Sequence, residues 1–385
     1  MKHSTNRILV THAGSLPRPH DLLDMMREKL SGRDYDKGKY DARLKSATAE
    51  IVRKQIEVGV DIPADGETSK PGFFSYIQER LTGIEGKPER KLRLFAKEVD
   101  AFPEYYADYF QRAMLGGSVA PFVPAFCTGA VKYKGEEILK RDLENLKSAL
   151  TGLKYEEAFV PSTAPSGVAQ NEYYKTEEEF FEALGEAMRT EYKAIVDAGF
   201  LLQVDDPFLS DIVYDYRDDA KMLARKAGMY VESINHALRG IPAEKVRFHT
   251  CYGINDGPRL HEASLMEVIP HMLKINAQAF SFEAGNVRHE HEYHVFETVK
   301  LQPGQIIIPG VITHASNIIE HPELVAERLT RFANLCGREN VIAGADCGFS
   351  SQATYKPEVN PKVMWEKFKA MSEGAAIASK KLWAK

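Results

Sequence analysis

Two side chains that bind soft metal ions stand two positions apart in this chain. His249 and Cys251 are separated by a single threonine, and on a β-strand residues i and i+2 point to the same side. An imidazole nitrogen and a thiolate presented in this way could hold one metal ion. Taken alone, the pair is more typical of a buried structural histidine beside a packed cysteine.

Two further residues of ligand type change that balance. Glu283 and Cys347 each follow a short apolar run, and if these runs are parallel strands of a closed barrel, both residues face the same mouth as His249 and Cys251. Two thiolates with an imidazole and a carboxylate suit Zn²⁺. Zinc would keep a substrate thiol deprotonated near neutral pH and still nucleophilic. The alternative is a closed zinc site that only stabilises the fold.

The elements that would position these residues follow an alternating pattern. Eight apolar runs bounded by turn residues predict strands, and long stretches with helical spacing lie between them. This alternation is typical of parallel βα units and predicts an α/β fold, a single (β/α)8 TIM barrel. The predicted strands are Ile8–Thr11, Asp61–Pro63, Ala158–Pro161, Leu201–Val204, Val246–Thr250, Ala279–Glu283, Ile306–Val311 and Val341–Ala345, and the clearest predicted helices are Ala42–Gly59, Glu177–Ala198, Asp219–Leu238, Pro322–Leu335 and Pro361–Ala378.

One stretch interrupts the alternation. Residues 85–152 carry an aromatic cluster and a predicted hairpin around Phe122–Lys134, and we interpret them as an insertion after the second βα unit. The aromatic residues would either pack the insertion against the barrel or serve as lid or pocket residues. We expect residues 1–385 to form one zinc-binding barrel domain that contains this insertion.

Composition excludes several classes of protein. The 385 residues carry 50 Lys and Arg against 55 Asp and Glu, so the chain has no net positive charge that would attract nucleic acid. No apolar run is long enough to span a membrane, and the N-terminal residues lack the apolar segment of a signal peptide. Four cysteines in a chain of this length predict free thiols in a reducing, cytoplasmic setting. Association of identical copies is compatible with this composition.

These residues, with several neighbouring motifs, resemble the C-terminal catalytic barrel of cobalamin-independent methionine synthase. The resemblance runs from Ile8 to about Ser379 and keeps the family's order of motifs on successive strands. Its members hold zinc and transfer a methyl group to homocysteine, which implies a role in methionine biosynthesis. The motifs are Gly14-Ser15-Leu16-Pro17, Asp65-Gly66-Glu67, Val204-Asp205-Asp206-Pro207, His249-Thr250-Cys251, Glu283 and Asp346-Cys347-Gly348.

The resemblance implies a role for each matching residue. The zinc ligands would be His249, Cys251, Glu283 and Cys347, and the homocysteine site would use Gly14, Ser15, Glu67 and Asp205. Carboxylates suit an ammonium group, and backbone N–H groups with a serine hydroxyl suit a carboxylate.

The methyl donor is left open, because the second barrel of the full methionine synthase and its tryptophan-bearing folate segment have no counterpart here. A folate, a methylated corrinoid or another carrier could supply the methyl group. The family has a histidine near the seventh strand that suits protonation of a folate leaving group, and His314 lies close to that position. His314 is therefore a candidate general acid, with an ordinary exposed-loop histidine as the alternative.

Three other functions compete with methyl transfer to homocysteine. The epoxyalkane:coenzyme M transferases are similar in the opening motif and would open an epoxide with a sulfonate thiol, although Glu67 and Asp205 would repel a sulfonate. A metal-free decarboxylase resembling uroporphyrinogen decarboxylase, or a zinc-storage protein, would need no thiol substrate.

Alternating His and Glu in 289–292 could form a second metal site, but we expect a solvated charge run.

Overall fold

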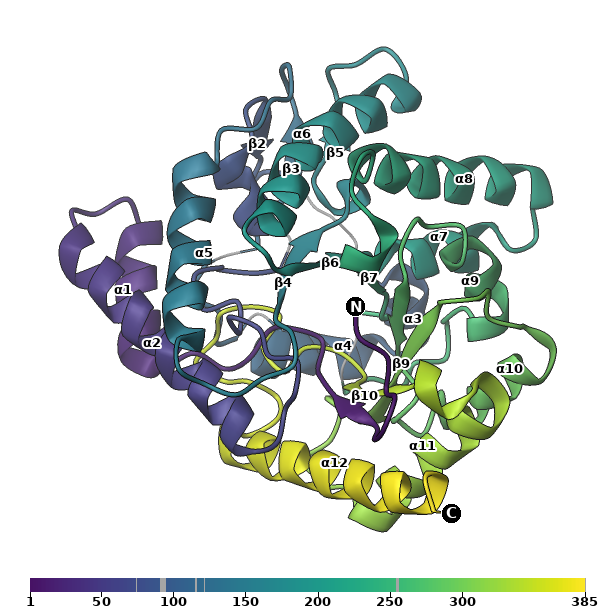
Figure 1. Ribbon diagram of the computed structural model, residues 1–385. Coiled ribbons are helices and arrows are strands. Elements are labelled where there is room, and N and C mark those ends of the chain that lie inside the picture. Colours follow the sequence, from purple (N-terminus) through teal and green to yellow (C-terminus); the bar gives the residue numbers. More distant parts are fainter. Residues whose placement is uncertain (74, 91–94, 115, 121, 254–255, 385) are drawn as a thin grey trace.

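A curled parallel sheet forms the centre of the molecule in the computed structural model, which describes residues 1–73, 75–90, 95–114, 116–120, 122–253 and 256–384 (Figure 1). Within these residues the sheet has seven strands in the order β1-β10-β9-β8-β7-β6-β4, and every pairing in it is parallel. The strands are β1 (Leu9–Val10), β4 (Phe159–Thr163), β6 (Leu201–Asp205), β7 (Val246–His249), β8 (Ala279–Phe282), β9 (Ile306–Ile312) and β10 (Ile342–Ala345). The predicted α/β class is confirmed, and seven of the predicted strands match within two residues at each end.

The remaining predicted strand, Asp61–Pro63, is not a strand in the structure. Its residues lie between the two edges of the sheet, because the N–H groups of Asp61 and Ile62 both donate to Val10 O (2.9 and 3.1 Å) and Phe159 N donates to Pro63 O (3.0 Å). Ala64 adds one parallel bridge to Phe159. Pro63 has no N–H to donate, so a regular ladder cannot run through it.

Alternate strand residues build two separate cores. On β9, Ile306 and Ile308 belong to a cluster inside the curl of the sheet, where Ile62 also packs. Ile307, between them, belongs to the larger cluster between the sheet and the helices. This period of two follows from the alternating direction of side chains on a strand, and it leaves the residues just beyond each strand free to face the open end.

The helices surround the sheet, and their first turns carry the expected signals. The Thr176 side chain caps α6 by accepting from Glu179 N, Ser264 and Glu267 form a capping box on α9, and proline begins α11 and α12. The helices are α1 (His20–Leu30), α2 (Lys37–Glu57), α3 (Ala96–Ala101), α4 (Pro103–Tyr109), α5 (Glu136–Leu150), α6 (Glu177–Asp197), α7 (Phe208–Tyr216), α8 (Ala220–Ala237), α9 (Leu265–Met272), α10 (Val295–Thr298), α11 (Pro322–Cys336) and α12 (Pro361–Leu382).

The stretch 85–152 does not contain the predicted hairpin. Its strand β3 (Ala125–Cys127) pairs with β2 (Ile84–Gly86) on one side and with β5 (Gln170–Asn171) on the other. The prediction around Phe122–Lys134 was wrong because β3 finds its partners far away in the sequence. Helix α5 packs against α2 in the outer layer, and residues 91–94, 115 and 121 of this stretch lie outside the described residues.

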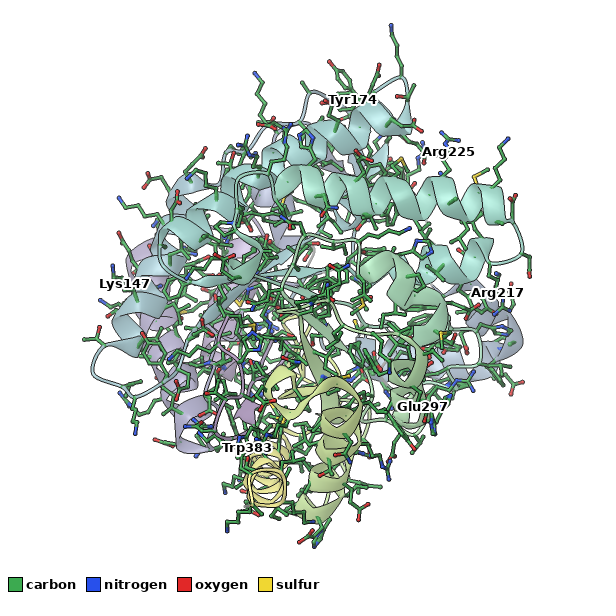
Figure 2. The ribbon with its side chains drawn as sticks, turned by 45° about the vertical axis from the view of Figure 1, so that its right-hand side comes forward. Lys147, Tyr174, Arg217, Arg225, Glu297 and Trp383 are labelled. Atoms are coloured by element: carbon green, nitrogen blue, oxygen red, sulfur yellow. The ribbon has the colours of Figure 1, made fainter. Side chains whose placement is uncertain are left out.

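Charged side chains lie at the periphery of the molecule. Figure 2 shows Lys147, Arg225 and Glu297 pointing outward from α5, α8 and α10. Trp383, just after α12, donates from its indole N–H to Thr5 O (3.0 Å) and so connects the last helix to the first residues. Among the helices of the described residues, none combines the length and apolar character that a membrane span requires.

A buried histidine beyond β1 gives the fold a pH-dependent stability. The Nδ1 of His12 accepts from Gly14 N (3.1 Å) while Nε2 bonds to Gln55 Oε1 (2.7 Å), an arrangement that only the neutral ring can make. Burial, in spite of the bond to Gln55, lowers the pKa of His12 from 6.5 to about 3. The stability that depends on the neutral ring is therefore present above pH 6.5 and is lost as the pH falls from 6.5 toward 3.

We expect the variant His12→Asn, whose Oδ1 can still accept from Gly14, to be less sensitive to acid. Between pH 7.5 and 5.0 the wild type should lose about 2 kcal/mol more unfolding free energy than the variant, since one pKa unit corresponds to about 1.4 kcal/mol. Urea unfolding at both pH values measures this difference. Equal losses in the two proteins would contradict the assignment.

Candidate metal centre and substrate cavity

His249, Cys251 and Cys347 come together at the open end of the curled sheet. Their ligand atoms all lie within 4.8 Å of one another. His249 ends β7 and Cys347 lies two residues beyond β10, and because all the strands are parallel and the sheet is curled, their ends meet at one rim. The three residues expose 4%, 7% and 9% of their surface, so they are buried in the wall of the site.

The imidazole of His249 has the form that a metal requires. Its Nδ1 bonds to Ser281 Oγ on β8 (3.0 Å), which fits the tautomer with the proton on Nδ1. Its Nε2 is buried and, among the described residues, has no hydrogen-bond partner. Burial, followed by the charge of Arg247, lowers the pKa of His249 to about 3, so the ring is neutral at pH 7. Neutral imidazole with a free nitrogen is the ligating form.

The Cys251 thiol is held in its neutral form by its surroundings. The neighbouring Cys347 and burial raise the pKa of Cys251 well above its ordinary value, and the charge of Glu283 adds to the effect. A cation among these groups reverses that shift and stabilises the thiolates. Two cysteines with an orphaned imidazole nitrogen are a donor set that fits zinc.

Glu283, the expected fourth ligand, is held by other partners. Its Oε2 accepts from Arg259 Nη2 (2.7 Å) and Asn286 Nδ2 (2.8 Å), and its Oε1 accepts from Tyr252 N (3.2 Å). Burial raises the pKa of Glu283, although Arg259 opposes the shift. Glu283 groups with His314 and Asp346, whose ligand atoms lie within 4.8 Å of its own, rather than with the three residues above.

Arg259 connects this carboxylate to a buried charge network. Its Nε donates to Glu262 Oε1 (2.8 Å), and Glu262 and Glu292 flank the ring of His289 at 2.9 and 2.8 Å. Burial alone would lower the pKa of His289, but these two carboxylates raise it to about 9. The prediction of a solvated charge run was therefore wrong for His289 and Glu292, because partners remote in sequence bury them.

A cavity of about 1140 Å³ opens beside the three converging residues. Its wall includes Ser15, Glu67 and Asp205 together with His249, Cys251 and Cys347. Gly14, Glu283 and His314 do not line it. Six of the nine predicted site residues thus share one cavity, and the other three lie behind its wall.

Gly14 turns the chain so that Ser15 reaches the cavity. Its φ of +124° is one that side-chain-bearing residues rarely adopt, and a Cβ there would lie 2.6 Å from Pro161 Cγ. A Cβ on Gly348 would lie 1.9 Å from Ser15 Oγ, so the Ser15 hydroxyl packs directly on the backbone that follows Cys347. Both glycines are needed for this close approach.

The two predicted substrate carboxylates differ in their surroundings. Glu67 accepts from Lys70 Nζ (3.0 Å), which also donates to Pro161 O (2.7 Å). Asp205 accepts from Gln203 Nε2 (2.8 Å), and burial, followed by the charge of Glu67, raises its pKa well above the ordinary value. A cationic group bound at Asp205 would offset the cost of ionising this buried carboxylate.

His314 lies two residues beyond β9 and exposes only 2% of its surface. The alternative of an ordinary exposed-loop histidine is therefore wrong. Burial lowers the pKa of His314 to about 4, although the charge of Asp346 opposes this. Its Nδ1 is buried without a hydrogen-bond partner among the residues that the structure describes, so this ring nitrogen is available for a further hydrogen bond.

Part of the cavity wall comes from the stretch 85–152. Phe95, Lys97, Tyr109 and Phe122 all line the cavity. Tyr109 also belongs to an aromatic cluster with Tyr106 and Ala113 that packs within the stretch itself. The aromatic residues therefore combine the packing and the cavity-facing positions that the sequence left as alternatives.

Several residues of the site carry little or no signal in the sequence. Ser281 orients His249, Arg259 and Asn286 hold Glu283, and Lys70 neutralises Glu67. Arg259 lies in a segment without periodicity and Lys70 resembles any surface lysine, so neither could be recognised without the fold. Asn286 and Ser281 have one weak signal, their closeness in sequence to Glu283.

The comparison with family models matches residues 162–366 to the catalytic domain of the cobalamin-independent synthases. Among curated proteins, the methionine synthase of Sulfolobus acidocaldarius is 26% identical over 347 residues, covering 88% of this chain and 84% of the relative. That of Sulfurisphaera tokodaii is 25% identical over 378 residues, covering 97% and 93%. In each comparison the alignment covers most of this chain and most of the relative.

Solved structures share the fold. A B12-independent methionine synthase from Shewanella sp. W3-18-1, in complex with selenomethionine, matches with a TM-score of 0.73 and 20% identity, over 98% of this chain and 100% of that one. A putative vitamin-B12 independent methionine synthase from Listeria monocytogenes matches with a TM-score of 0.66 and 19% identity, over 99% and 100%. At these identities the likeness concerns the fold.

Proposed function

The chain belongs to the cobalamin-independent methionine synthase family, and on that premise we propose that it is a zinc-dependent enzyme that methylates the sulfur of homocysteine to give methionine. The observation that carries the proposal is the convergence of the ligand atoms of His249, Cys251 and Cys347 within 4.8 Å of one another beside the cavity. Family membership favours methyl transfer over the decarboxylase and the storage protein. Free cysteines throughout the described residues agree with a cytoplasmic enzyme.

His249, Cys251 and Cys347 would hold the zinc, with Glu283 as an exchangeable fourth ligand. When bound, zinc supplies the positive charge that keeps a substrate thiol deprotonated near neutral pH. The protein orients the two reactants, so that the sulfur and the donor methyl carbon meet in line. Cys251 and Cys347 expose 7% and 9% of their surface, which supports a centre reached from the cavity.

The amino-acid end of homocysteine would lie between two sets of groups. Asp205 and Glu67 would bind the ammonium, since both carboxylates line the cavity and, among the described residues, the Asp205 carboxylate accepts a hydrogen bond from Gln203 alone. The Ser15 hydroxyl would bind the carboxylate, and Gly14 would act by setting the turn that brings Ser15 to the cavity. This arrangement selects an amino-acid thiol over a sulfonate thiol.

The methyl donor would occupy the rest of the cavity. A volume of about 1140 Å³ is larger than a single small ligand requires, which supports a second, larger reactant such as a methylated folate or a corrinoid. His314 would donate a proton to the departing carrier.

We further propose that residues 61–64 close the sheet into a complete (β/α)8 barrel, and that the stretch 85–152 is an insertion in this single domain that covers the cavity.

The test is thiol-dependent methyl transfer with a choice of acceptors. We expect zinc-loaded protein to form methionine from homocysteine and a methyl donor, and to leave 2-mercaptoethanesulfonate unmethylated. Asp205→Asn should raise KM for homocysteine by about 10- to 100-fold, because a charged hydrogen bond contributes about 1.5–3 kcal/mol. Mass spectrometry of the products with methylated folate and methylated corrinoid measures both the acceptor and the donor.

The matched control is Asp211→Asn, which removes a carboxylate that lines the same cavity without touching Gln203. Its KM for homocysteine should stay within about twofold of wild type, the scatter expected for a residue without contact to the thiol. Preference for the sulfonate thiol would overturn the proposal in favour of the epoxide-opening relatives.

A further inference from the structure

The contacts of Glu283 point to a role for an arginine outside the predicted ligand set. We propose that Arg259 is a positioning residue that competes with the metal for Glu283, so that the carboxylate moves between the guanidinium and the metal as the substrate thiol enters. This inference rests on the proposed zinc-dependent function. It identifies Arg259 as the partner that binds the Glu283 carboxylate while that carboxylate is not bound to the metal.

The two oxygens of Glu283 are unequally engaged. Oε2 accepts both short bonds, from Arg259 at 2.7 Å and Asn286 at 2.8 Å, whereas Oε1 accepts one longer bond of 3.2 Å from Tyr252 N. Tyr252 directly follows Cys251, so Oε1 is bonded to the backbone next to a proposed ligand. The carboxylate is therefore anchored to the arginine by one oxygen, while the other is held by the weaker of its contacts.

Arg259 is held firmly enough to act as a fixed alternative partner. Its Nε donates to Glu262 Oε1 (2.8 Å), and its guanidinium lies 5.4 Å from the centre of the Tyr252 ring, whose other contact is a stacked His289 at 4.3 Å. Its backbone has a φ of +57°, which a non-glycine residue adopts only when its surroundings enforce it. The protein therefore accepts local strain to place this side chain.

The arginine also has an unused donor. Nη1 is buried and has no hydrogen-bond partner among the residues described. A carboxylate that engaged both Nη1 and Nη2 would have the paired geometry that arginine and carboxylate prefer. The guanidinium can therefore bind the carboxylate more tightly whenever the metal releases it.

The expected effect of this role on zinc affinity is opposite to that of an ordinary supporting residue. Loss of a residue that only orients a ligand weakens metal affinity by about 10- to 100-fold. Loss of a competitor strengthens it, because Glu283 no longer has to leave a cationic partner to reach the metal. The direction of the change in zinc affinity therefore separates the two roles.

We would measure zinc affinity of the full chain by competition with a chromophoric chelator. Arg259→Met should bind zinc about tenfold more tightly than wild type, the equivalent of one charged hydrogen bond that no longer competes, and Arg259→Lys, which keeps the charge, should stay close to wild type. In a Glu283→Gln background the Arg259→Met substitution should have no effect, since the group under competition is gone. Arg328→Met is the matched control, because Arg328 is also buried and bonded to a carbonyl and a glutamate, Val311 O and Glu290.

A second readout follows the carboxylate itself. X-ray absorption of zinc-loaded wild type should lose an oxygen ligand and gain a sulfur when homocysteine is added, whereas Arg259→Met should keep the oxygen and require a higher thiol concentration. Weaker zinc binding in Arg259→Met, or an equal effect in the Glu283→Gln background, would overturn the inference and leave the proposed function standing. A wild type that binds no zinc would overturn both.

Discussion

Replacement of Cys251 by serine, or of Cys347 by alanine, is expected to remove zinc and methyl transfer together while the fold persists. Each variant removes one of three donors within 4.8 Å, and a hydroxyl or a methyl group is a poor substitute for a soft thiolate. Zinc content should fall from about one ion per chain to near zero, and methionine formation should fall below detection. The circular dichroism spectrum should be unchanged, because the cores on both faces of the sheet are apolar and independent of the ion.

Cys336→Ser is the matched control for that experiment. Cys336 ends α11 and is only partly buried, away from the three donors, so this variant should keep both its zinc and its activity. Full activity in a zinc-free Cys251 or Cys347 variant would contradict the proposed mechanism. Loss of the fold in the variants, with zinc retained until unfolding in wild type, would indicate a structural ion instead.

The second large effect is expected at His314 with a methylated folate as donor. His314→Asn should lower kcat by about 10²- to 10⁴-fold, the range for loss of a general acid. Burial lowers the pKa of His314 to about 4, so the protonated ring is scarce at pH 7 and becomes roughly tenfold more abundant for each pH unit down to 4. Wild-type kcat should therefore rise as the pH falls, and His314→Asn should lose that slope.

Stopped-flow measurement of single turnovers between pH 5.5 and 8 separates this chemical step from product release. His291→Asn is the control, because His291 is an exposed histidine at the same end of the molecule. Zinc content must stay at the wild-type level in both variants. An unchanged folate-dependent rate in His314→Asn would remove His314 from the mechanism.

Much of the fold could be predicted from local pattern, and the failures have identifiable causes. Buried runs such as Ile306–Val311 are marked by composition alone, because strands of a parallel sheet are covered on both faces. Asp61–Pro63 has the apolar pattern but also a proline, and instead of a regular ladder it makes two backbone hydrogen bonds to Val10 of β1 and one to Phe159 of β4. The pairing of β3 with β2 and β5 depends on contacts that no local pattern contains.

The candidate site also combines features that the sequence predicts with features that it does not. The positions of His249 and Cys347 at one rim follow from strand ends, which sequence can locate. The partners of Glu283 do not follow, because Arg259 reaches it from a loop without regular spacing. Burial of His289 between two glutamates reverses the expectation of a solvated charge for the same reason. Sequence located the donors, and only tertiary contacts reveal which partners restrain them.

The strand order has a consequence for how the enzyme is made. β10 is the last strand of the sheet in the chain and pairs with β1, the first, as well as with β9. Cys347 follows β10, whereas His249 and Cys251 belong to β7 and the residues after it, three βα units earlier. On the proposed zinc binding, a nascent chain on the ribosome carries His249, Cys251 and Glu283 well before Cys347 is synthesised. Completion of the sheet and completion of the zinc site would then coincide, so that zinc uptake would mark a finished molecule.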